Sequence, residues 1–189
     1  MSNSDTSLTD AEIAAIARGM TRPLVLVGMM GVGKSSIGRR LAQLLGLEFM
    51  DADTEIEEAA QMSVSEIFAT FGEEYFRDGE RRVIARLMEH GPCVIATGGG
   101  AFVNAETRAL VLEQGLAIWL DSDVDTLVER VGRKDTRPLL RDGDPREILG
   151  RLRSEREPFY AQAQIHVVSE AKPHHYTLNK ILQALKSWQ

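Results

Sequence analysis

The sequence predicts an α/β fold of three layers, in which a parallel β-sheet lies between two layers of helices. Short apolar runs alternate with longer amphipathic segments, a pattern typical of strands and helices that follow one another. A glycine-rich segment joins the first apolar run to the first long amphipathic segment. The expected strands are residues 24–27, 47–50, 94–97, 117–120 and 165–168.

The amphipathic segments predict helices near 35–45, 54–70, 73–90, 104–114, 123–132, 145–162 and 175–187. Residues 21–189 are therefore expected to form one domain, which is long enough to bury a core. Residues 1–20 are an N-terminal extension, with a polar tail and a short helix. In that helix Thr9 and Glu12 can form a capping box, and Gly19 marks the end. Packing against the domain and simple disorder are both open for the extension.

The composition is that of an ordinary globular protein, with 43% hydrophobic and 26% charged residues. A net charge of −6 argues against nucleic acid as a partner. The basic residues are uneven, since nine of the 22 Lys and Arg fall between positions 130 and 156. This cluster suggests a site for a small polyanion, although a solvated charged helix is an alternative.

One cysteine, Cys93, lies in an apolar run and is expected to be a buried thiol. A single cysteine predicts neither an internal disulfide nor a zinc site. The first residues carry acidic side chains and no apolar run, which argues against a targeting peptide. Since no apolar stretch has the length of a membrane span, we expect a cytoplasmic protein without a membrane partner.

The strongest signal is the pattern G-x-x-x-x-G-K-S at residues 28–35, between the first predicted strand and a helix. Glycines let main-chain N–H groups surround phosphates, and the helix N-terminus adds partial positive charge. Lys34 can place its ammonium on the β- and γ-phosphates, and the Ser35 hydroxyl suits Mg²⁺. A glycine turn that only caps a helix is the alternative. The context favours a nucleoside triphosphate site.

The base of that nucleotide is expected to be adenine. A guanine-specific switch would carry the motif N-K-x-D, and the one Asn-Lys pair, at Asn179, is followed by Ile and Leu. A GTP switch is therefore not expected, and ATP is the expected nucleotide. The loop alone does not distinguish a kinase from a switch or a motor.

Two carboxylates follow the second predicted strand, at Asp51 and Asp53. Residues two apart on a strand point the same way, and parallel sheets bind ligands at the carboxyl ends of their strands. One carboxylate could hold Mg²⁺ through water, and the other could accept the proton of an attacking hydroxyl. The alternative is that Asp53, or Thr54 with Glu57, caps the next helix.

Three glycines, Gly98–Gly100, follow the third predicted strand. They would let a ligand touch the backbone, although a plain tight turn is equally compatible with the spacing.

Four arginines are candidate ligands of anions. Arg77 has glutamates three and four positions away, so a surface ion pair is an alternative for it. Arg156 and Arg130 have no acidic residue at those positions, which favours an external anion. Arg137 lies in a stretch of polar residues, proline and glycine at 133–145, which is expected to be a mobile lid.

These features together resemble the shikimate kinase family. The matching segments keep the family's order and spacing across residues 24–187. They are the phosphate loop at 28–35, the two aspartates at 51 and 53, Phe76-Arg77, Gly98–Gly100, the segment 137–140 and the segment 156–160.

The resemblance implies a five-stranded parallel sheet of order 2-3-1-4-5, as in nucleoside monophosphate kinases. It implies ATP and Mg²⁺ as cofactors, and phosphorylation of the 3-hydroxyl of shikimate on the route to aromatic amino acids. On the acceptor side it implies a substrate-binding segment at about 53–82. There Asp53 contacts the hydroxyl, Arg77 and Arg156 hold the carboxylate, and the Gly99 backbone touches the substrate.

On the nucleotide side the resemblance implies that Arg137 reaches the phosphates and that Arg130 lies against adenine. The metal ligands are Ser35 and, through water, Asp51. Asp53, Lys34 and Arg137 are the implied catalytic residues. The implied nucleotide-binding residues are Gly31, Val32, Gly33, Lys34, Ser35, Ser36, Arg130 and Arg137.

Two other functions stay open on the sequence alone. The chain could phosphorylate another small acceptor, such as gluconate or a nucleotide, or it could be a regulatory module that binds nucleotide without turnover. The paired aspartates, the three glycines and the two arginines argue against the first, and the intact set of Lys34, Ser35, Asp51 and Asp53 argues against the second. We expect a monomer, since nothing in the sequence points to an obligate dimer.

Overall fold

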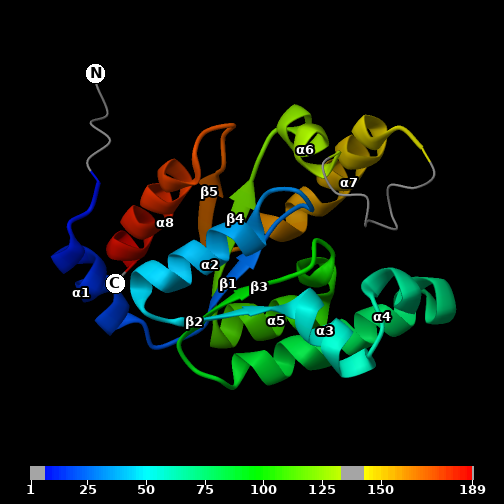
Figure 1. Ribbon diagram of the computed structural model, residues 1–189, viewed down its shortest axis with the longest axis horizontal. Coiled ribbons are helices and arrows are strands. Elements are labelled where there is room, and N and C mark those ends of the chain that lie inside the picture. Colours follow the sequence, from blue (N-terminus) through cyan, green and yellow to red (C-terminus); the bar gives the residue numbers. More distant parts are fainter. Residues whose placement is uncertain (1–6, 133–142, 189) are drawn as a thin grey trace.

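A five-stranded parallel sheet forms the centre of the molecule, in the order β2-β3-β1-β4-β5 (Figure 1). The structure is a computed structural model and describes residues 7–132 and 143–188. The strands are β1 (Leu24–Val27), β2 (Glu48–Asp51), β3 (Cys93–Ala96), β4 (Leu116–Asp121) and β5 (Ile165–Val168). Every pairing is parallel, so all carboxyl ends meet at one edge. The order and the strand predictions are confirmed, the latter to within one residue.

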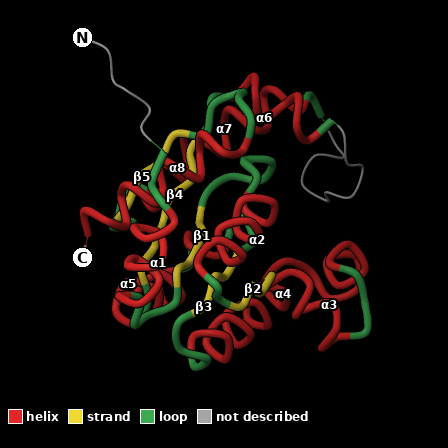
Figure 2. The backbone as a smooth tube through the Cα atoms, turned by 60° about the vertical axis from the view of Figure 1, so that its left-hand side comes forward, coloured by secondary structure: helices red, strands yellow, loops and turns green. Residues whose placement is uncertain are grey.

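Helices cover both faces of the sheet (Figures 1 and 2). Helix α2 packs with α1 and α8 on one side, α4 and α5 pack together on the other, and α6 packs against α7. The helices are α1 (Asp10–Gly19), α2 (Lys34–Leu45), α3 (Ala52–Ala60), α4 (Val64–Met88), α5 (Ala105–Gln114), α6 (Val124–Val131), α7 (Pro145–Tyr160), α8 (His174–Trp188) and the short 3-10 helix η1 (Ala101–Val103).

The three inner strands are buried almost throughout, which explains why they appear in the sequence as unbroken apolar runs. The edge strand β5 instead alternates buried and exposed residues. Cys93 opens β3 and is only 1% exposed, so the prediction of a buried core thiol is confirmed.

The Cys93 thiol is expected to be almost unreactive in the folded protein. Burial raises its pKa to about 11, with the nearby charge of Glu48 acting in the same direction. At pH 8 the reactive thiolate is therefore scarce as well as covered. A thiol-reactive chromophore should label the folded protein slowly and the urea-unfolded protein with one equivalent. Rapid labelling of the native protein would contradict this burial.

The helices between β2 and β3 differ from the prediction. The sequence pattern predicts a single helix over 54–70, but α3 ends before Gln61, whose φ of 53° closes the turn. A new helix starts after Ser63, which forms a capping box with Glu66. This helix runs to Met88 across a kink at Gly72. The spacing of Ser63 and Glu66 is the sequence signal that marks the second helix start.

Residues from α3 and the first half of α4 form a small apolar cluster of their own, built on Ile56, Ile67 and Phe76. The main core instead joins the sheet to the surrounding helices. The proposed substrate-binding segment therefore has its own packing centre.

Helix α1 of the N-terminal extension packs against the domain. The predicted capping box of Thr9 and Glu12 is present, and the helix ends at Gly19 as expected. Ile16 is 2% exposed within the main core, and Glu12 pairs with Lys186 of α8 at 2.7 Å. Of the two open alternatives for the extension, packing is therefore correct for this helix.

Replacing Ile16 with alanine is expected to lower the free energy of unfolding by about 2–4 kcal/mol, because the change leaves a cavity between α1 and the domain. Urea unfolding followed by circular dichroism measures the loss. Ala15→Ser, at an exposed position of the same helix, is the matched control. An equal, small effect of both changes would show that α1 contributes little to stability.

Candidate functional site

The phosphate loop connects β1 to α2, as the motif predicts. Met29 and Val32 are buried and anchor the loop to the core. Gly28 has a φ of 135°, and a Cβ at this position would lie 2.2 Å from the Leu120 carbonyl oxygen of β4. Only glycine fits here, because both the backbone conformation and the approach of β4 exclude a side chain. Gly31, Gly33, Ser35 and Ser36 complete the loop and the first turn of α2.

Lys34 lies inside this loop. Its side chain is largely buried, and Nζ donates hydrogen bonds to the carbonyl oxygens of Gly28 at 2.7 Å and Met29 at 2.9 Å. These bonds hold the ammonium against the first residues of the phosphate loop. The positive charge is thus fixed where the motif leads us to expect phosphate.

Ser35 and Asp51 bring a hydroxyl and a carboxylate together beside the loop. Ser35 Oγ donates to Asp51 Oδ2 at 2.5 Å, and Asp51 Oδ1 accepts from the Asp53 N–H at 3.1 Å. Asp51 is therefore the N-cap of α3, and the alternative that Asp53, or Thr54 with Glu57, caps this helix is wrong. The helix starts directly after the strand, earlier than the sequence suggested.

Asp53 lies in the first turn of α3 and not on the strand, so strand alternation does not determine its direction. Its carboxyl group nevertheless stays at the carboxyl edge of the sheet. Burial raises the pKa of Asp53, and the negative charge of Asp51 raises it further, while Lys34 and Arg77 oppose the shift. Asp53 is thus a carboxyl group with raised basicity, close to the ammonium of the phosphate loop.

The three glycines after β3 make room for charged side chains. A Cβ at Gly98 would lie 2.6 Å from Glu80 Oε1 and 3.1 Å from Asp53 Oδ1. One at Gly100 would lie within 2.7 Å of the Arg77 guanidinium. One at Gly99 would lie 3.3 Å from Arg156 Nη1 and 3.2 Å from the Met30 nitrogen of the phosphate loop. The segment is therefore more than a tight turn, because it is where these groups converge.

Arg77 forms the ion pairs that its helix neighbours suggested, with Glu80 at 2.6 Å and Glu73 at 3.3 Å. The pair with Glu80 is not on the surface, since Glu80 is 1% exposed. Burial raises the pKa of Glu80, with Arg77 acting against that shift. Within the described residues Glu80 Oε1 has no hydrogen-bond partner.

Glu80 is a site residue that the sequence reasoning missed. It follows Phe76 and precedes Ile84 at intervals of four, and both of these are buried. A glutamate on the buried stripe of a helix is a signal that could have identified it. The spacing of three residues between Arg77 and Glu80 by itself predicts only an ion pair on the helix surface.

Arg156 is the second arginine of the site, on the inner face of α7. It is 8% exposed, and within the part of the chain that the structure describes its Nη1 has no hydrogen-bond partner. The Tyr160 hydroxyl, one turn further along α7, donates to the carbonyl oxygen of Gly99. Arg156 thus presents a buried cation beside the glycine segment, as its lack of acidic helix neighbours indicated.

Arg130 is better satisfied than the sequence indicated. Its guanidinium donates to the carbonyl oxygens of Val32 at 3.1 Å and Glu170 at 3.0 Å. The expectation of an unpaired arginine is wrong, because its partners are backbone groups remote in sequence. Arg130 does lie where the phosphate loop meets the segment after β5.

Arg137 and most of the predicted lid lie outside the described residues.

Neither a membrane-spanning helix nor a metal-binding cluster is found among the described residues. No described helix is both long and apolar enough to cross a membrane. No three His, Cys, Asp or Glu side chains of residues 7–132 and 143–188 are grouped so that they could hold a metal ion.

Comparison with known proteins identifies the shikimate kinase family. The model of the shikimate kinase family matches residues 30–186. A shikimate kinase of Novosphingobium aromaticivorans is 65% identical over 185 residues, 96% of each chain, and one of Caulobacter vibrioides is 59% identical over 87% of this chain and 82% of its own. The solved structure of shikimate kinase from Acinetobacter baumannii in complex with shikimate aligns with a TM-score of 0.87 at 33% identity, covering 96% of this chain and 99% of that one. By sequence and by fold, this chain belongs to the shikimate kinase family.

Proposed function

We propose that this protein is an ATP-dependent kinase that phosphorylates the 3-hydroxyl of shikimate and releases ADP and shikimate 3-phosphate. Membership of the shikimate kinase family supports this activity. The similar Acinetobacter enzyme, whose structure was solved in complex with shikimate, supports the choice of acceptor. The chemistry of the site supports both independently.

The observation that carries the proposal is the buried, unpartnered Nη1 of Arg156 beside Gly99, within the described residues. A buried guanidinium with an unsatisfied N–H group is unfavourable, and an anion that enters the site relieves the cost. A planar carboxylate fits a guanidinium in a bidentate manner. A small hydroxy acid can thus place its carboxylate on Arg156 and Arg77 while a ring hydroxyl reaches Asp53.

The nucleotide side of the site has the donors that a magnesium nucleotide needs. Ser35 and Asp51 offer two oxygen donors 2.5 Å apart, a set that fits Mg²⁺ if phosphate and water supply the remaining ligands. When bound, Mg²⁺ would neutralise charge on the phosphates. We assign Ser35 as a direct ligand and Asp51 as a ligand through water. Lys34 and the main-chain N–H groups of Gly31, Val32 and Gly33, with the first turn of α2 at Ser36, would hold the phosphates.

In the proposed reaction, the 3-hydroxyl oxygen of the acceptor attacks the γ-phosphorus in line with the bond to the bridging oxygen of ADP. That bond breaks, and the hydroxyl proton passes to Asp53. Lys34 and, from outside the described residues, Arg137 stabilise the charge on the transferred group, and Arg130 lies against the adenine. Arg77 and Arg156 fix the acceptor so that its hydroxyl meets the phosphate.

The setting in which the protein works is also a proposal. We propose that it acts in the cytoplasm as a monomer, with neither nucleic acid nor membrane as partner, in the synthesis of aromatic amino acids. The acidic net charge is the supporting observation for the absence of a nucleic-acid partner.

One assay distinguishes this function from the alternatives. ADP release from magnesium ATP is measured with shikimate, gluconate, nucleoside monophosphates or no acceptor. We expect a large stimulation by shikimate alone. Stimulation by another acceptor instead would identify that compound as the substrate. ATP binding without turnover would favour a regulatory module.

A further inference from the structure

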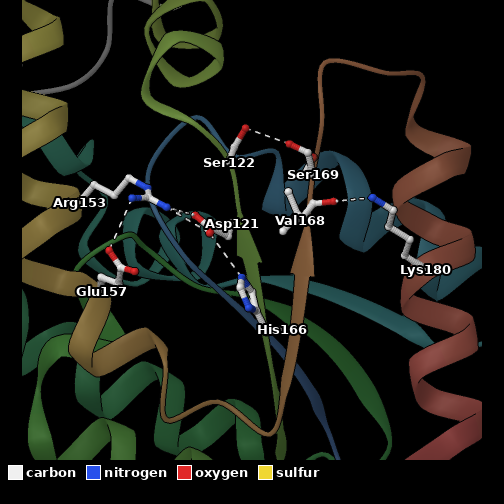
Figure 3. Close-up of polar contacts among 8 residues, drawn as sticks. All are labelled: Asp121, Ser122, Arg153, Glu157, His166, Val168, Ser169 and Lys180. Carbon is white, nitrogen blue, oxygen red and sulfur yellow. Dashed lines mark hydrogen bonds and ion pairs between the residues drawn. The ribbon is translucent and has the colours of Figure 1, made fainter.

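An ion pair beside the acceptor site attaches helix α7 to the sheet (Figure 3). Arg153 Nη2 lies 3.2 Å from each carboxylate oxygen of Asp121, the last residue of β4. The two side chains are 28% and 13% exposed, so the pair is partly shielded from water. Shielding weakens screening by salt and favours one fixed geometry, in contrast to exposed pairs.

The Asp121 carboxylate is the group on which the neighbouring polar contacts converge. His166 of β5 stacks on Trp119 and places Nε2 3.4 Å from Asp121 Oδ2. Arg153 also reaches Glu157 at 3.5 Å, but Glu157 lies on the same helix and is half exposed. Only the contact with Asp121 therefore connects Arg153 to the sheet among the interactions drawn in Figure 3.

Arg153 and Arg156 are neighbours on one face of α7. Residues 153, 156 and 160 follow at intervals of three and four, so their side chains point to the same side of the helix. Arg153 is held by Asp121, and Tyr160 is held by the Gly99 carbonyl oxygen. Arg156 lies between these two attachments. Because its own Nη1 lacks a partner within the described residues, the placement of α7 determines where its guanidinium points.

We propose that Arg153, through Asp121, is a positioning residue for Arg156 and sets the affinity of the site for the carboxylate of the acceptor. The inference rests on the proposed function, in which Arg156 binds that carboxylate. Without the pair, α7 gains freedom to rotate or slide along the end of β4. A displacement of well under one turn spoils a charge-assisted hydrogen bond, because such bonds depend on distance and angle.

The test compares Arg153→Met and Asp121→Asn with the full-length wild type, by the KM for shikimate and for ATP. Each change is expected to raise the KM for shikimate roughly three- to tenfold and to leave the KM for ATP within about twofold. The double variant should be no worse than the single ones, because both remove the same interaction. Arg153→Lys, which keeps the charge, should recover part of the affinity.

Two controls separate positioning from a general loss of structure. Arg151→Met alters an exposed arginine of the same helix that pairs with Glu155 at 3.8 Å, and it should change neither KM. Shikimate methyl ester lacks the carboxylate charge, so wild type and Arg153→Met should use it with the same, low kcat/KM.

Each outcome can be assigned. A wild type that does not phosphorylate shikimate would reject the proposed function itself. With an active wild type, three results for Arg153→Met would overturn the positioning role. The first is an unchanged KM for shikimate, and the second is an equal rise of the KM values for shikimate and ATP. The third is a fall in kcat/KM for the methyl ester as large as the fall for shikimate. Thermal unfolding monitors folding, and if Arg153→Met does not fold, Asp121→Asn, which preserves volume, decides by the same criteria.

Discussion

Replacing Asp53 with asparagine is expected to lower kcat by about 10²–10⁴, because the change removes the proposed acceptor of the proton of the attacking hydroxyl. The size of the side chain is kept, and the phosphate loop is untouched. Steady-state ADP release gives kcat, and calorimetric titration with magnesium ATP gives the nucleotide affinity, which should stay close to that of the wild type.

The stability of the same variant separates lost chemistry from lost structure. Burial, followed by the charge of Asp51, raises the pKa of Asp53 in the folded protein. An acid whose pKa is raised by folding destabilises the folded state once the pH exceeds its unfolded pKa, since the charged form is disfavoured. At pH 7 Asp53→Asn should therefore unfold at the same Tm or a higher one.

The raised pKa of Asp53 should also appear in the pH dependence of the reaction. The kcat/KM of the wild type is expected to fall on the acid side through a pKa above the ordinary aspartate value, as the base becomes protonated. Asp78→Asn, on the exposed side of α4, is the matched control and should leave rates unchanged. Wild-type turnover by Asp53→Asn, or a loss of activity matched by unfolding, would remove Asp53 from the mechanism.

Replacing Arg156 with methionine is expected to raise the KM for shikimate roughly 30-fold or more, because the carboxylate loses its proposed buried charged partner. The KM for ATP should change little. Without ligand, the variant should be at least as stable as the wild type, since a buried cation with an unpartnered Nη1, within the described residues, is replaced by an apolar side chain. Steady-state kinetics and thermal unfolding measure the two effects.

Two results would contradict this assignment of Arg156. A change confined to the affinity for ATP would place the arginine on the nucleotide side of the site. A large fall in Tm without a change in KM would make its role structural. Arg77 cannot serve as the control, because it also pairs with the buried carboxylate of Glu80 on the same helix.

The parts of the fold and site that the sequence predicted are those whose chemistry is local. The strands appear as apolar runs because β1, β3 and β4 are buried on both faces. The phosphate loop is recognisable because it must supply glycines, one lysine and one hydroxyl within eight positions. Even the helix of the N-terminal extension was marked by its capping box.

Two of the errors concern contacts that are distant in sequence, and a third concerns the exact boundary between a strand and a helix. The Arg130 guanidinium is satisfied by carbonyl oxygens 98 and 40 positions away, which no pattern of helix neighbours reveals. The sequence indicates only a surface ion pair between Glu80 and Arg77. The burial of Glu80 is not predicted, because it depends on how α4 packs against the glycine segment. The capping role fell to Asp51, since the exact end of β2 decides which aspartate precedes the helix.

The most direct test of the central claim is to identify the phosphorylated product. The claim is that the triphosphate of ATP and the hydroxyl of a carboxylate-bearing acceptor meet between the phosphate loop and Asp53. Phosphorus–proton correlation NMR of a reaction with magnesium ATP and shikimate should show one new phosphate ester, coupled to the proton on carbon 3. An ester on another hydroxyl, or no ester at all from protein that binds ATP, would contradict this arrangement of the two substrates.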